Sequence, residues 1–312
     1  MATISTPTAA SRPPPAVSVM EVSPRDGLQN EKTLVSTEDK LTLIHRAIDA
    51  GCRRIEVTSF VNPKRVPQMA DADLLCRQLP QRGDVTYAGL VLNQKGYERL
   101  LATERLDEAG LVIPASDTFG SRNQGQTVAE GLAMARAVLR DARQRGFAAQ
   151  VTIAVAFGCP FEGEVPVSRI REMAAALAEE GPVHLGLADT IGVGGPTDVL
   201  ERFAAVRDVV GDEIPLRAHF HDTRNTGIAN AFAALQCNVD ILDASIGGIG
   251  GCPFAPNATG NIATEDLVYM LQRAGVDHGV ELSQLIDGAG WLEGVLGKPV
   301  PSMLLKAGGF PA

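Results

Sequence analysis

Short runs rich in β-branched and apolar residues alternate with helical segments along almost the whole chain. The runs cover residues 17–22, 54–59, 85–91, 110–113, 150–156, 183–188, 216–220 and 239–245. The segments between them have helical periodicity, and two of them, residues 37–50 and 196–210, end just before a glycine. Eight strand–helix units at a spacing of roughly 30 residues indicate one closed parallel (β/α)8 barrel, a TIM barrel of the α/β class. The rival architecture, an open doubly wound sheet, would contain fewer strands.

The chain of 312 residues is long enough for one such barrel with additions. Because composition marks no linker, we expect a single catalytic domain over residues 17–312, with extra C-terminal helices from Thr264 onward. Residues 1–16 are rich in Ser, Thr, Ala and Pro. They contain neither the apolar stretch of a signal peptide nor the Arg-rich pattern of a transit peptide. This stretch is therefore predicted to be a disordered N-terminal tail.

Charge and motif content exclude several classes of function. The 28 Lys and Arg against 37 Asp and Glu give a net charge of −9, which disfavours nucleic acid as a partner because phosphate binding needs basic side chains. No apolar run approaches the ~20 residues of a membrane span. The chain lacks phosphate-loop, dinucleotide-binding and serine-hydrolase motifs. Its five cysteines have no C-x-x-C spacing, so we expect neither disulfides nor a zinc–thiolate site and place the protein in the cytoplasm.

Polar residues gather where the β runs end. Arg25 and Asp26 follow the first run, Glu56 lies in the second, Asp189 ends the sixth in GLADTIG, and the seventh ends in HFHDT. In a (β/α)8 barrel the carboxyl ends of all strands meet at one face, which carries the chemistry. These side chains are therefore candidates for one shared site.

His219 and His221 are the most informative of these residues. Two positions apart on a strand, they project to the same side, so both imidazoles can bind one divalent metal. The spacing alone leaves a metal site and two structural histidines equally open. Asp26 and Asn261, in the loop after the eighth run, are candidate further ligands. Imidazole, carboxylate and amide ligands without thiolate suit Mg²⁺ or Mn²⁺, although Zn²⁺ or Co²⁺ can also occupy such a site.

The loop after the eighth run, GGIGGCPFAPNATGN, is crowded with small residues. Glycines allow either a close backbone approach to a ligand or a mobile cover. Cys252 lies in its middle. A thiol beside a cationic site can transfer protons, but spacing alone favours a small packing residue at Cys252.

Longer motifs carry a family resemblance. The strings SPRDGLQNEK, EVTSFVNPKRVPQMAD, GCPFEG, LADTIGVG, HFHDT and GIGGCPFAPNATGNIATEDLVYML occur in this order over nearly the whole chain. They resemble the 3-hydroxy-3-methylglutaryl-CoA lyases, which belong with the isopropylmalate and homocitrate synthases to a wider group of metal-dependent (β/α)8 barrels. The resemblance implies a carbon–carbon lyase that acts on an acyl-CoA, needs a divalent cation and forms a homodimer.

Residue roles follow from the same resemblance. It implies that Asp26, His219, His221 and Asn261 ligate the cation. Arg25 would face the thioester oxygen, and Cys252 would take part in proton transfer, whereas Asp26 or His219 could be the base. Glu56 and Asp189 would belong to the polar wall that binds substrate.

Two departures bear on the substrate. Arg224 and Asn225 replace the Tyr-Gly pair that usually follows HDT, and Ala188 stands where a glycine is usual. Arg224 can bind a substrate carboxylate or simply face solvent at the start of a helix. We therefore keep three hypotheses: cleavage of 3-hydroxy-3-methylglutaryl-CoA, a related lyase or Claisen-type synthase with a substrate such as citramalyl-CoA, and a catalytically silent binding protein.

Overall fold

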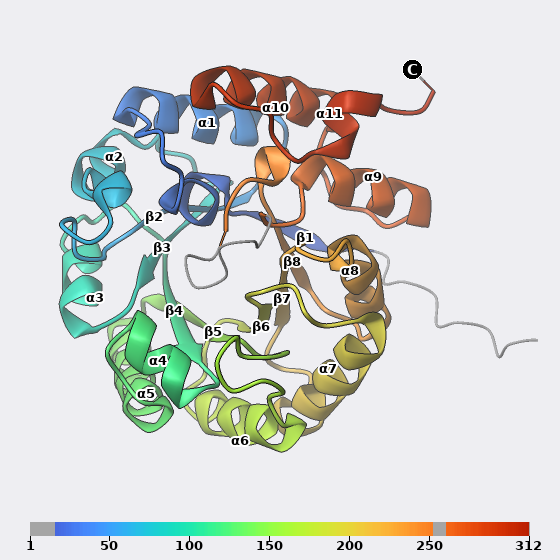
Figure 1. The fold of residues 1–312 in the computed structure, drawn as a ribbon. Helices are drawn as coiled ribbons and strands as arrows, with labels where there is room; N and C mark the ends of the chain where they lie inside the picture. The colour runs from blue at the N-terminus through green and yellow to red at the C-terminus, as the bar shows by residue number, and fades with distance from the viewer. Residues whose placement is uncertain (1–15, 252–259, 312) are drawn as a thin grey trace, which may run out of the picture.

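Eight parallel strands close into a barrel in the computed structural model, which describes residues 16–251 and 260–311. Each strand pairs with the next, and β8 returns to pair with β1, so the predicted (β/α)8 architecture is confirmed. Figure 1 looks along the barrel, with the helices in a ring outside the strands. The strands are β1 Ser18–Glu21, β2 Arg54–Ser59, β3 Thr86–Val91, β4 Glu108–Pro114, β5 Ala148–Ala154, β6 Leu185–Asp189, β7 Leu216–Phe220 and β8 Ile241–Ala244.

The helices follow the strands in alternation, and the C-terminal ones are additions to the barrel. Helix α10 packs beside α1, and α11 beside α9 and α10 (Figure 1). Within the described residues, no helix is both long and apolar enough to cross a bilayer. The elements are α1 Thr37–Asp49, α2 Ala72–Gln78, α3 Gln94–Leu101, α4 Asp117–Asn123, α5 Val128–Arg145, α6 Val167–Ala178, α7 Pro196–Val210, α8 Gly227–Gln236, α9 Thr264–Ala274, α10 Leu282–Leu296, α11 Met303–Ala307, and the short turns η1 Ser23–Gly27, η2 Pro67–Met69 and η3 Ile246–Gly248.

Local sequence signals set the helix ends. Helix α5 begins with a capping box, in which Thr127 and Glu130 satisfy each other's backbone N–H groups, and it ends at Gly146 in the left-handed conformation. The side chain of Ser36 accepts a hydrogen bond from the backbone N–H of Asp39 at the start of α1. Both α1 and α7 match the expected helices to within one residue.

The main apolar core lies between the strands and the helices. Strand β7 shows how the chain divides its side chains: Leu216, Ala218 and Phe220 belong to this core, whereas Arg217 and His219 line a cavity inside the barrel. Alternation along the strand therefore separates packing from chemistry. The predicted tail lies outside the described residues except for Ala16, which forms an isolated bridge with Asp277.

Two buried carboxylic acids join the loops at the carboxyl ends of β1 and β8. Glu21 accepts hydrogen bonds from the backbone N–H groups of Ser23 and Ile246 and from the hydroxyl of Thr264. Glu265 accepts from the backbone N–H of Gly247 through both of its oxygens, at 3.0 and 3.2 Å. The loop after β1 and the connection from β8 to α9 are thereby held together, and burial raises the pKa of both groups, that of Glu265 to about 8.

We expect Glu265→Gln to flatten the pH dependence of stability. The folded-state pKa of Glu265 lies above its ordinary value of 4.5, so the folded chain keeps a proton that the unfolded chain releases. This stabilisation is complete below the unfolded-state pKa and is lost as pH rises through the folded-state pKa. Between about pH 5 and about pH 8, the wild type should lose unfolding free energy relative to the variant by up to about 1.4 kcal/mol per pH unit.

Urea unfolding at several pH values measures this difference. Glu213→Gln, at an exposed loop position, is the matched control and should keep the wild-type slope. Equal slopes for the wild type and Glu265→Gln would contradict the prediction.

Candidate active site

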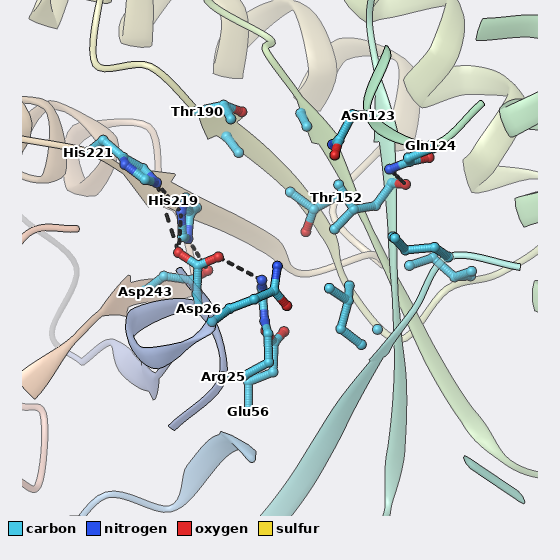
Figure 2. Close-up of a pocket in the computed structure, with 18 of the residues that line it drawn as sticks. Arg25, Asp26, Glu56, Asn123, Gln124, Thr152, Thr190, His219, His221 and Asp243 are labelled. Carbon is cyan, nitrogen blue, oxygen red and sulfur yellow. Dashed lines mark hydrogen bonds and ion pairs between the residues drawn. The ribbon is translucent and has the colours of Figure 1, made fainter. Parts of the chain in front are cut away.

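A cavity opens inside the barrel at the carboxyl ends of the strands. Figure 2 shows charged and imidazole side chains gathered on one side of it, with neutral polar side chains across from them. Its polar lining consists of Arg25, Asp26, Gln29, Asn30, Glu56, Asn123, Gln124, Gln150, Thr152, Thr190, Arg217, His219, His221 and Asp243.

Arg25 and Asp26 enter the cavity from η1, a π-helical turn directly after β1. The backbone N–H of Gly27 bonds back to the carbonyl of Val22 at 3.1 Å, which closes this wide turn. A side chain at Gly27 would not fit, because its Cβ would lie 2.8 Å from Oγ of Ser245. The turn therefore packs tightly against the exit of β8 and directs both charged side chains inward.

Asp26, His219 and His221 converge on one point. The Nε2 atoms of the two histidines lie 3.1 Å apart, and the Oδ2 atom of Asp26 lies 3.8 Å from the Nε2 of His219 and 3.9 Å from that of His221 (Figure 2). The three side chains form the one His, Cys, Asp or Glu group in the described part of the chain whose ligand atoms can share a metal ion. The arrangement matches the predicted H-x-H pair.

Asn261, from the loop between β8 and α9, lies beside this group. Asn261 forms an isolated β-bridge with His221, and its side-chain Nδ2 donates a hydrogen bond to Oδ2 of Asp26 at 2.9 Å. The Oδ1 of Asn261 is buried and accepts no hydrogen bond from the described residues. Gly250 lies against this amide at a positive φ of 117°, and a Cβ there would approach Nδ2 to 2.5 Å.

These donors fit a divalent cation. Two imidazole nitrogens, a carboxylate and an amide oxygen without a hydrogen-bond donor are hard to intermediate ligands of the kind that Mg²⁺ and Mn²⁺ accept. Burial raises the pKa of Asp26, but Arg25 and the two histidines together lower it well below the usual range. The carboxylate is therefore ionised at neutral pH, as metal binding requires.

Arg25 is held between two carboxylates at the edge of this group. It is 7% exposed, its Nε donates to Glu56, and its Nη1 donates to Oδ1 of Asp26 at 2.6 Å. Burial lowers the pKa of Arg25, but the two carboxylates reverse the effect and raise it. A fixed guanidinium thus lies beside the candidate metal position, where it can stabilise negative charge on a ligand.

Three further side chains that were not predicted from the sequence also line the cavity: Arg217, Gln150 and Asp243. Arg217 binds both oxygens of Asp243, at 2.6 and 2.7 Å, and donates to Oε1 of Gln150. Arg217 occupies the position two before His219, so the pattern R-x-H-x-H was a usable signal. Asp243 lies inside the predicted β run over residues 239–245, and no neighbouring residue marked it as a site residue.

Asp189 and Arg224 are not among the residues that line the cavity. The carboxylate of Asp189 accepts backbone N–H groups of Val193 and Gly194, at 3.0 and 2.9 Å. Arg224 donates to the carbonyls of Ile191 and Gly192. Both side chains bind the loop between β6 and α7. Cys252 lies outside the described residues, although Gly251 before it lines the cavity.

Comparison with known proteins agrees with the recognised motifs. The HMGL-like family pattern matches residues 16–290. The (R)-citramalyl-CoA lyase of Chloroflexus aurantiacus is 43% identical over 303 residues, 94% of this chain and 95% of that protein. Hydroxymethylglutaryl-CoA lyase YngG of Bacillus subtilis is 40% identical over 300 residues, 94% of this chain and 97% of that protein.

A solved structure extends the likeness to three dimensions. The HMG-CoA lyase of Acinetobacter baumannii, in complex with coenzyme A and 3-methylmalate, matches with a TM-score of 0.90 and 37% identity, covering 95% of this chain and 96% of that one. The predicted family resemblance is confirmed, and the chain belongs to the HMGL-like family, which includes the hydroxymethylglutaryl-CoA lyases.

Proposed function

We propose that this protein is a divalent-metal-dependent carbon–carbon lyase that cleaves 3-hydroxy-3-methylglutaryl-CoA to acetyl-CoA and acetoacetate by a retro-Claisen reaction. The observation that carries the proposal is the convergence of Asp26, His219 and His221 beside Arg25 in one cavity. Acyl-CoA lyases that share 40 and 43% of their residues with the chain support the same reaction class.

The cation would be held at one side of the cavity by Asp26, His219, His221 and Asn261. A bound Mg²⁺ or Mn²⁺ makes a coordinated tertiary hydroxyl easier to deprotonate, because it stabilises the negative charge on oxygen. Of the two candidate bases, Asp26 is the one we propose to take the hydroxyl proton, because the ring of His219 would have Nε2 on the cation and Nδ1 bound to Asp243.

Arg25 would stabilise the departing fragment. When the bond between C2 and C3 breaks, its electron pair passes to C2, the hydroxyl oxygen becomes the keto oxygen, and the charge spreads onto the thioester oxygen. A fixed guanidinium aimed at that oxygen stabilises this enolate. A proton then returns to C2 to give acetyl-CoA. Cys252 is our candidate donor, with a metal-site histidine as the alternative, since Gly251 beside Cys252 lines the cavity.

(R)-Citramalyl-CoA is the second candidate substrate. The Chloroflexus aurantiacus relative that is 43% identical is a citramalyl-CoA lyase. In this substrate the free carboxylate is attached directly to the carbon that bears the hydroxyl, so cleavage gives pyruvate in place of acetoacetate. A Claisen-type synthase would run the same bond change in reverse.

A substrate panel tests the proposal. Purified protein is incubated with each acyl-CoA, with and without EDTA, and acetyl-CoA release is measured by a coupled assay. Higher kcat/KM for 3-hydroxy-3-methylglutaryl-CoA supports the first candidate, and higher kcat/KM for citramalyl-CoA supports the second. No metal-dependent acetyl-CoA release from either substrate would contradict the proposed lyase.

Removal of the metal or of a ligand should abolish activity. EDTA treatment is expected to stop acetyl-CoA release, and Mg²⁺ or Mn²⁺ should restore it. His221→Ala should lower kcat/KM by more than about 100-fold, because the loss of a direct ligand weakens metal binding more than the loss of an outer-shell contact does. His45→Ala, at an exposed position of α1, is the matched control and should keep wild-type activity. Full activity of His221→Ala would rule out this ligand assignment.

Arg25→Met should lower kcat by about 100- to 1,000-fold, the usual effect of removing one group that stabilises an oxyanion. KM should change much less, because this charge develops only as the bond breaks. Arg82→Met is the matched control, since Arg82 pairs with Asp84 just before β3, at the opposite end of the barrel. A rise in KM without a fall in kcat would mean that Arg25 only binds substrate.

A further inference from the structure

Both ring nitrogens of His219 have defined partners on opposite sides. Nε2 faces His221 and Asp26, where the proposed metal would bind. Nδ1 lies 2.9 Å from Oδ2 of Asp243, which is 2% exposed and comes from the neighbouring strand β8. Asp243 therefore contacts the ring nitrogen of His219 that does not face the other candidate ligands.

Arg217 fixes Asp243 in that position. Its Nε and Nη2 atoms donate to the two carboxylate oxygens at 2.6 and 2.7 Å, and its Nη1 donates to Gln150 on β5. Arg217 and His219 project from the same side of β7, beside β8, so the barrel itself brings the three side chains together. A fork of this kind holds a carboxylate more firmly than a single hydrogen bond does.

The hydrogen bonds determine where the imidazole proton lies. Arg217 supplies only donors, so the carboxylate of Asp243 is an acceptor for both neighbours. Its Oδ2 must accept from Nδ1–H of His219. A neutral His219 then has an unprotonated Nε2, whose lone pair faces His221 and Asp26.

We propose that Asp243, held by Arg217, is a positioning residue that fixes the Nδ1–H tautomer and the ring orientation of His219, so that Nε2 is available to the metal. The inference rests on the proposed metal-dependent function. Asp243 is not itself one of the converging ligands, because it contacts Nδ1 of His219 whereas Asp26 faces Nε2. It acts only through His219.

Metal affinity measures this role directly. Metal-free wild type and Asp243→Asn are titrated with Mn²⁺, and free Mn²⁺ is followed by electron paramagnetic resonance. We expect the Kd of the variant to rise by about 10- to 100-fold, the usual loss when an outer-shell partner of a ligand is removed. Three N–H donors point at the two carboxylate oxygens of Asp243. The side-chain amide of Asp243→Asn must turn its NH2 group toward at least one of these donors, so that hydrogen bond is lost.

Asp240→Asn is the matched control. Asp240 lies just before β8 and accepts from the backbone N–H of Leu216, at the other end of the same strand pair. This variant should bind Mn²⁺ with wild-type affinity. An unchanged Kd for Asp243→Asn, with tight binding by the wild type, would overturn the positioning role alone. A wild type that binds no Mn²⁺ would overturn the proposed metal function and this inference with it.

The tautomer can be read from the wild type without any variant. In the metal-free protein at a pH where His219 is neutral, ¹⁵N shifts should show a protonated Nδ1 and an unprotonated Nε2 for this ring. Free imidazole side chains prefer the opposite tautomer, so a merely structural Asp243 would not require this signature. Observation of the Nε2–H tautomer at His219 would overturn the proposal even if Asp243→Asn fails to fold.

Discussion

Charge compensation inside the barrel is the constraint on which the site depends. Arg25 and Arg217 are buried among Asp26, Glu56 and Asp243, and each guanidinium contacts two of these carboxylates. With neutral imidazoles, two positive and three negative groups leave a net charge of −1. Because a buried charge without a partner is very costly, each member keeps the others in place. A divalent cation at the same point would bring the net charge to +1, which suits an anionic substrate.

The closed barrel decides which residues can share this network. Strand β1 pairs with both β2 and β8, and β8 pairs with β7, so these four strands form one arc of the wall. Every charged and imidazole side chain of the network comes from these four strands, from the turn after β1 or, for His221, from the position directly after β7. Across the cavity lie the neutral side chains of Asn123, Gln124 and Thr152 (Figure 2). The cavity thus has one charged wall and one neutral polar wall.

The site could be predicted from sequence where its residues stand next to each other or alternate along one strand. Arg25 and Asp26 are adjacent, and His219 lies near the end of β7 with His221 two positions later, so local spacing alone predicted that the members of each pair lie together. Asp189 was also predicted from its position at a strand end, but its carboxylate accepts hydrogen bonds from the backbone of the loop that follows it. A strand-exit position brings a side chain near the barrel mouth, whereas its rotamer and its hydrogen bonds decide whether it reaches the cavity.

The sequence by itself determined the number and order of the strands, the ends of several helices and the presence of a converging pair of histidines, because these features depend on periodicity and on neighbours within a few residues. Only the tertiary structure decided that Asn261 meets Asp26 and that Asp243 contacts His219. Residues 26 and 261 meet because β8 closes onto β1, and residues 243 and 219 meet because β8 pairs with β7. Contacts between residues so far apart in the chain are set by barrel closure and strand register, and no local pattern encodes them.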